Sequence, residues 1–168
     1  MKIAIVYATS TGNTAQVAQA IKEACEGHEI VAFGPAPQDV DRAELVFAGS
    51  WTDKGTCAEE MKEFLHSLYG KRIALFGTAG FGISQTYFGT LAQRFQEEVP
   101  KGNQVLGSFF CTGKMPPEIR ARYEAQLKAD PNNGKLETML KAYDLALDHP
   151  NGEDLEQAKA FAAEMLEK

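Results

Sequence analysis

Six residues near the N-terminus have the side chains and the position to bind a phosphate group. These residues are Thr9, Ser10, Thr11, Gly12, Asn13 and Thr14. They come directly after the apolar residues 3–8 and directly before a helical pattern. The first N–H groups of a helix have no partner within it and lie at the positive end of its dipole, so an anion gains hydrogen bonds there. The residues therefore predict a phosphate site. The alternative is a ligand-free N-capped turn, for which a single Ser, Thr or Asn would suffice.

The composition of this loop excludes two common nucleotide sites. It contains no Lys that could neutralise a triphosphate, and it lacks the Gly-x-x-x-x-Gly-Lys spacing. The Gly-x-Gly-x-x-Gly spacing of dinucleotide sites is absent after the first apolar segment as well. A neutral loop lined by hydroxyls suits a phosphate monoester that is bound and not hydrolysed.

Two later loops have residues suited to a planar ring. Residues 49–56 contain Trp51, the only tryptophan of the chain, which could stack on such a ring. Residues 76–84 are rich in glycine, which lets a backbone approach a ligand closely. The alternative for Trp51 is that it only fills the edge of the core.

Alternating strand and helix patterns predict the scaffold that positions these loops. We expect strands at residues 2–8, 29–33, 45–49, 72–77 and 104–111, with helices between them. Right-handed crossovers then give an α/β fold with a doubly wound, five-stranded parallel sheet of order 2-1-3-4-5. Ligands bind such sheets beyond the carboxyl ends of the strands, so the loops after strands 1, 3 and 4 should form the site.

Extra helices are expected after the fifth strand. Residues 112–150 contain two helical patterns, and a final helix follows with Asn151 as its N-cap. We interpret residues 1–168 as a single domain with this helical insertion. The insertion could lie near the ligand or a partner, where Lys114 could reach an anionic group, or it could extend the wall of the domain.

The first loop resembles the Thr/Ser-x-Thr-Gly-x-Thr motif of flavodoxins, and the loop after strand 4 is similar to the Phe-Gly-Ser-Tyr-Gly-Trp-Gly type loop of short-chain flavodoxins. The resemblance covers residues 1–111 and the final helix. It implies noncovalent binding of FMN, with the phosphate held by residues 9–14 and Trp51 and Phe81 on the two faces of the isoalloxazine ring. The ring-binding residues it implies are Ser50, Trp51, Thr52, Asp53, Lys54, Gly55, Thr78, Ala79, Gly80, Phe81 and Gly82.

The resemblance further implies a flavodoxin-like electron carrier that passes electrons between a reductase and an acceptor flavoenzyme. A backbone carbonyl among Asp53, Lys54 and Gly55 would then turn toward N5 of the flavin. No catalytic acid or base stands out in the three loops. The phrase at residues 51–56 is also similar to one in flavodoxin-like proteins of anaerobic bacteria, some of them linked with bilirubin reductase.

Three other functions are to be weighed against the electron carrier. The first is an FMN-dependent reductase of a quinone or tetrapyrrole-type substrate, with the extra helices shaping its pocket. A receiver-type signalling domain needs acidic residues where this chain has Thr9, Ser10, Gly49 and Ser50, so it is disfavoured. The last is an interaction module without a cofactor.

Composition narrows the class of protein. A net charge of −6 over 168 residues argues against a nucleic-acid surface and favours a basic protein partner. No segment approaches the roughly 18 apolar residues of a membrane span, so we expect a cytoplasmic protein that does not bind membranes. Cys25, Cys57 and Cys111 suggest neither a disulfide framework nor a zinc site. A start of a helix at Cys57 would stabilise its thiolate, but a redox role is disfavoured because the sequence offers no basic neighbour beyond Lys54 and no resolving cysteine.

Overall fold

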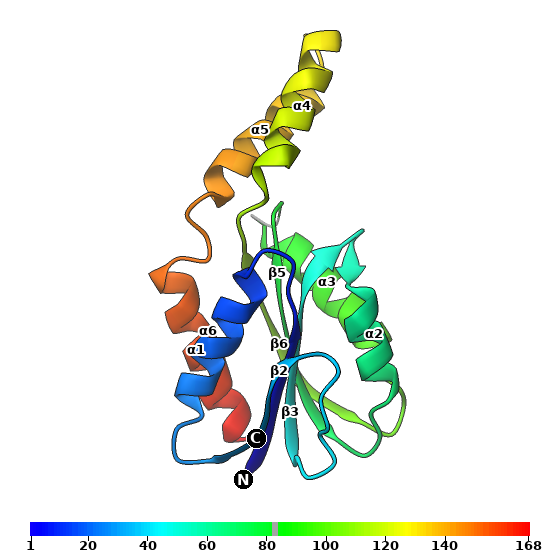
Figure 1. The fold of residues 1–168 in the computed structure, drawn as a ribbon, viewed down its shortest axis with the longest axis vertical. Helices are drawn as coiled ribbons and strands as arrows, with labels where there is room; N and C mark the ends of the chain where they lie inside the picture. The colour runs from blue at the N-terminus through cyan, green and yellow to red at the C-terminus, as the bar shows by residue number, and fades with distance from the viewer. Residues whose placement is uncertain (82–83) are drawn as a thin grey trace.

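The computed structural model describes residues 1–81 and 84–168, and its centre is a parallel β-sheet (Figure 1). The sheet order is β2-β1-β3-β5-β6, and a short strand, β4, pairs with β3 in the antiparallel sense. The strands are β1 (Lys2–Ala8), β2 (Glu29–Pro35), β3 (Leu45–Asp53), β4 (Thr56–Cys57), β5 (Arg72–Ala79) and β6 (Gln104–Thr112). Apart from β4, the order is the predicted 2-1-3-4-5, so the fold prediction is confirmed.

Helices cover both faces of the sheet. One face is covered by α1 (Asn13–Ala24) and α6 (Gly152–Leu166), and the other by α2 (Glu59–His66) and α3 (Gln85–Glu97). Ile3 and Ile5 of β1 pack toward α1 and α6, whereas Ala4 and Val6 pack in the cluster that includes α2. Strands buried on both faces read as continuous apolar runs, which is why they were recognisable in the sequence.

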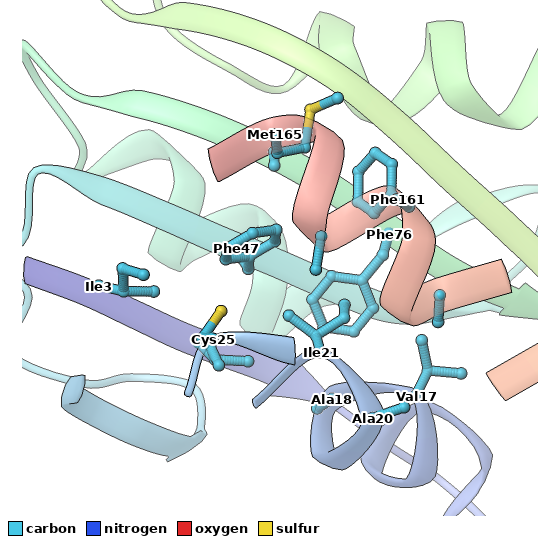
Figure 2. Close-up of a cluster of buried hydrophobic side chains, with 14 of the residues drawn as sticks. Ile3, Val17, Ala18, Ala20, Ile21, Cys25, Phe47, Phe76, Phe161 and Met165 are labelled. Atoms are coloured by element: carbon cyan, nitrogen blue, oxygen red, sulfur yellow. The ribbon is translucent and has the colours of Figure 1, made fainter. Parts of the chain in front are cut away.

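The core beneath α1 and α6 is built from long-range contacts. Phe47 of β3 and Phe161 of α6 meet edge to face with their ring centroids 6.3 Å apart, and Figure 2 shows Phe76 and Met165 in the same cluster. Cys25 is also buried there as a free thiol. This packing holds α1 and α6 against one face of the sheet.

Helices α4 (Pro117–Ala129) and α5 (Gly134–Ala146) form a hairpin that stands away from the body, beyond the carboxyl ends of the strands (Figure 1). Tyr123 of α4 and Tyr143 of α5 are buried although the hairpin does not lie on the sheet. Arg120 joins the two helices because its Nη1 lies 2.6 Å from Asp144 Oδ1. The hairpin therefore does not extend the wall of the domain.

The predicted capping of the last helix is confirmed. The Asn151 side chain accepts a hydrogen bond from the Asp154 backbone N–H, and the Asp154 side chain accepts one from the Asn151 N–H. Within the part of the chain that the structure describes, no helix has the length and apolar character to cross a bilayer.

Candidate functional site

A cavity of about 540 Å³ lies at the carboxyl ends of β1, β3 and β5, where the three predicted loops meet. From those loops it is lined by Ser10, Thr11, Asn13, Trp51, Thr52, Asp53, Lys54, Gly55, Thr78, Ala79, Gly80 and Phe81. The parallel register that pairs Ala8 with Ser50 and Trp51 with Thr78 brings these segments together. Gly82, a predicted ring-binding residue, lies outside the described residues.

The first loop is built as a turn into α1. The Thr9 hydroxyl accepts a hydrogen bond from the Gly12 N–H at 3.0 Å, and Gly12 has a φ of +88°, which favours glycine. Gly12 is the N-cap, no side chain caps the helix, and its first turn contains no acidic residue. The positive end of α1 thus remains available for an anion beside Ser10 and Thr11, which line the cavity.

Asn13 has a buried acceptor without a partner. The residue is 6% exposed, and its Nδ2 donates to the Lys114 carbonyl at 2.7 Å. Its Oδ1 is buried and has no hydrogen-bond partner among the described residues. Leaving such a group unsatisfied costs about 1–3 kcal/mol, and a ligand hydroxyl that donated to it would recover that cost.

Other predicted site residues use their hydroxyls to connect the loops. Thr14 Oγ1 and Thr78 Oγ1 lie 2.9 Å apart and share a buried hydrogen bond, while Thr52 Oγ1 donates to the Thr78 carbonyl at 2.9 Å. The Ser50 hydroxyl donates to the Trp51 carbonyl and accepts from the Ala58 N–H. Thr9, Gly12, Thr14 and Ser50 are not among the cavity-lining residues, and in this structure they shape the loops.

The segment after Trp51 forms a tight β-hairpin. Asp53 pairs with Thr56, and the two residues between them, Lys54 and Gly55, have φ values of +52° and +82°. Positive φ at both central positions is the geometry of a type I′ turn, which matches the twist of the flanking strands. The predicted strand ends at residue 49, whereas β3 continues to Asp53, because Ser50 and Trp51 extend the parallel pairing and the next two residues pair with β4.

Arg94 of α3 holds this turn from outside the predicted site. Its Nη1 donates to the Gly55 carbonyl at 2.9 Å, and a Cβ added to Gly55 would lie 2.7 Å from the same nitrogen. The Arg94 guanidinium ends a flexible side chain and could shift, so the φ of +82° is the main reason that glycine suits position 55. No local signal in the sequence connects Arg94 with a turn 39 residues earlier.

Trp51 and Phe81 line the cavity from different loops. Trp51 is half-buried and also packs on the core cluster beneath α2, so the cavity and the core share its side chain. Phe81 is 39% exposed, and its ring centroid lies 6.3 Å from that of Tyr123. Aromatic side chains from β3 and from the loop after β5 thus border one cavity.

The base of the α4–α5 hairpin supplies a further wall that the sequence reasoning missed apart from Lys114. The residues outside the predicted loops that line the cavity are Tyr87, Gly113, Lys114, Met115, Pro116, Ile119, Arg122 and Tyr123. This segment is held to the body because the Gly113 N–H donates to the Ala79 carbonyl at 3.2 Å and the Lys114 N–H to the His149 carbonyl at 2.8 Å. A Cβ on Gly80 would lie 2.4 Å from Met115 Cγ, so the two loops meet closely.

The cysteines have no place in this site. Cys57 lies in β4, before the start of α2, and is 1% exposed. Burial raises the pKa of its thiol to about 11, so the thiolate stabilisation considered for it is wrong. Burial also raises the pKa of Cys25 and of Cys111. Among the described residues, no group of His, Cys, Asp and Glu side chains could hold a metal ion.

A family model for the flavodoxin domain matches residues 4–163. The chain belongs to the flavodoxin family. Two curated relatives in this family share the name flavodoxin-like domain-containing protein BilS. The one from Clostridioides difficile (strain CD3) is 33% identical over 175 residues, covering 100% of this chain and 98% of the relative. The one from Clostridium symbiosum (strain WAL-14163) is 38% identical over 179 residues, covering 96% and 94%.

Solved flavodoxins share the fold of this member of the family. A short-chain flavodoxin associated with a non-canonical PDU bacterial microcompartment matches with a TM-score of 0.64 and 19% identity over 99% of this chain and 97% of that one. A Streptococcus pneumonia TIGR4 flavodoxin matches with a TM-score of 0.62 and 17% identity over 99% of both chains. A flavoprotein from Lactobacillus acidophilus NCFM, described in complex with FMN, matches with a TM-score of 0.53 and 18% identity over 65% of this chain and 92% of that one.

Proposed function

We propose that this protein binds one FMN noncovalently and acts as an electron carrier between redox partners, a reductase and an acceptor flavoenzyme. The observation that carries the proposal is the combination, in one cavity, of the uncapped start of α1 with two aromatic side chains from other loops. Family membership supports it, as does a fold neighbour that is described in complex with FMN.

The donors at the first loop suit a phosphate monoester. Ser10 and Thr11 present hydroxyls to the cavity, and the first N–H groups of α1 add donors and a positive dipole end. The orphaned Oδ1 of Asn13 can accept a hydrogen bond from a ligand hydroxyl, such as one on the ribityl chain. These residues would hold the phosphate and the chain next to it.

The opposite side of the cavity suits the ring. Trp51 and Phe81 would flank it, and the backbone of residues 78–80 and of the Lys54–Gly55 turn would approach its polar edge. Bound FMN supplies the redox chemistry itself, so the protein has to bind, orient and shield it. The cavity lining fits that task, because most of its described residues are small, hydroxyl-bearing or aromatic.

The hairpin base favours a second candidate, an FMN-dependent reductase of a planar substrate such as a quinone or a tetrapyrrole. Met115, Ile119 and Tyr123 add a wall beyond the three loops, and such a wall could hold a substrate against the ring. A reductase of this kind would need a side chain that supplies a proton to the substrate. Among the described lining residues Asp53 is the only carboxylate and there is no His, so the carrier remains our first proposal.

Reduction assays separate the two candidates. Purified protein loaded with FMN would be mixed with NADH or NADPH, first alone and then with a catalytic amount of a flavin reductase, while flavin absorbance is recorded. A carrier is reduced only when the reductase is present. Direct turnover with NAD(P)H and a quinone would favour the enzyme, and a purified protein with no flavin spectrum and no affinity for FMN would contradict both.

A further inference from the structure

The charge around the cavity is opposite to the charge of the whole chain. The protein has 23 acidic and 17 basic side chains and a net charge of −6. The charged residues that line the cavity are nevertheless Lys54, Lys114 and Arg122 on the basic side and Asp53 on the acidic side. We call Lys54, Lys114 and Arg122 the basic rim.

The cations of the basic rim are not neutralised by neighbours. All three residues are exposed, and within the described chain none of them forms an ion pair. The Arg122 guanidinium lies 5.5 Å from the centroid of the Tyr123 ring, a contact that adds no negative charge. By contrast, Arg120, only two residues earlier, is paired with Glu124 and with Asp144.

The basic rim comes from segments other than the predicted phosphate loop. Lys54 is in the β3–β4 turn, Lys114 in the connection from β6 to α4, and Arg122 in α4, whereas residues 9–14 are uncharged. Arg94, bonded to the Gly55 carbonyl, adds a further positive charge beside the turn that contains Lys54. Because the three residues of the basic rim line the cavity and are also exposed, their positive charge borders its opening.

We propose that the basic rim is the docking surface for an acidic face of a redox partner protein. This inference rests on the proposed function, because a partner must approach the cavity to exchange electrons with a flavin inside it. Complementary charge increases the rate of encounter and orients the partner, and it acts locally even when the net charge of the protein has the other sign. The partner surface is therefore acidic, not basic as the net charge alone would suggest.

An inert charged probe tests the surface without a known partner. The full-length, ¹⁵N-labelled protein, saturated with FMN so that the phosphate site is filled, would be titrated with hexacyanochromate(III), a trivalent paramagnetic anion. We expect amide signals of residues 53–55, 113–115 and 119–123 to broaden several-fold more than those elsewhere. The trivalent cation hexaamminechromium(III) should not broaden them preferentially.

Matched variants make the test specific. Lys54→Glu combined with Arg122→Glu should abolish the preferential broadening, whereas Lys128→Glu, at the exposed far end of α4, should leave it unchanged. Uniform broadening in the wild type, or equal broadening in the double variant, would overturn the proposal. The comparison of anion and cation in the wild type needs no substitution, so a variant that misfolds does not block the test.

Electron transfer gives a second readout. Each hexacyanoferrate(III) ion takes one electron from the reduced flavin, and the rate with this trivalent anion should fall as salt is added, because attraction is screened. A rate that rises with salt would show that the net negative charge dominates, and it would contradict the proposal.

If FMN does not bind, the proposed function fails but the basic rim can still be tested. The titration with hexacyanochromate(III) is then repeated on apoprotein with excess inorganic phosphate, where preferential broadening would still support the basic rim.

Discussion

The two ends of the cavity are assembled in different ways. The phosphate end is local in sequence, because residues 9–14 form one turn into α1 and Thr9 itself accepts the Gly12 N–H. The other end needs four distant segments, namely the β3–β4 turn, Arg94 of α3, the loop after β5 and the base of α4. At the first end, residue types alone predict that a phosphate binds. At the second end, the site exists only once the fold has brought the distant segments together.

The comparison predicts different losses when each end is changed. The largest effect is expected for Thr11→Ala, which removes a hydroxyl from the phosphate end. FMN binding should weaken by about 1–3 kcal/mol, the loss expected for a hydrogen bond to a charged acceptor, while riboflavin binding stays unchanged. Fluorescence titration measures both affinities. Thr138→Ala on the exposed side of α5 is the control and should alter neither.

A smaller and different effect is expected for Trp51→Ala at the ring end. FMN and riboflavin share the ring, so both affinities should fall by the same factor, about 1–2 kcal/mol on the scale of aromatic stacking. Isothermal titration is the measurement, since this variant has no tryptophan. If Trp51→Ala changes the thermal stability but neither affinity, the side chain only packs on the core.

Arg94→Met tests the long-range support of the turn. Losing the hydrogen bond to the Gly55 carbonyl should cost about 1 kcal/mol locally, so the amides of residues 54–57 should exchange with deuterium several-fold faster. The measurement needs no bound FMN. Gln93→Met, also exposed on α3, is the matched control. Equal exchange in both variants would show that the strand pairing alone maintains the turn.

The smallest effect is expected for Arg120→Ala in the hairpin. Its pairs with Glu124 and Asp144 are partly exposed, so their loss should lower stability by less than about 1 kcal/mol. Chemical denaturation checks the stability, and FMN titration should show an unchanged affinity. A weakening of FMN binding comparable with that of Thr11→Ala would mean that the hairpin controls the phosphate end.

The sheet order and most of the residues that line the cavity could be predicted from the sequence for a physical reason. Doubly buried strands such as residues 3–6 are continuous apolar runs, and a turn rich in Ser, Thr and Asn before a helix is a local signal. Arg94 and Arg122 could not be found in this way. Their places depend on long-range contacts. Arg94 of α3 reaches Gly55, 39 residues away, and the base of the hairpin is held by Asn13 Nδ2, which donates to the Lys114 carbonyl, 101 residues away.

The most direct test of the central claim is a pair of titrations on the wild-type apoprotein. Trp51 is the sole tryptophan, and it lines the cavity, so its fluorescence should be quenched as a flavin binds. We predict strong quenching with both flavins and a much higher affinity for FMN than for riboflavin, because only FMN has the phosphate that the start of α1 would hold. Equal affinities for the two flavins would contradict the account.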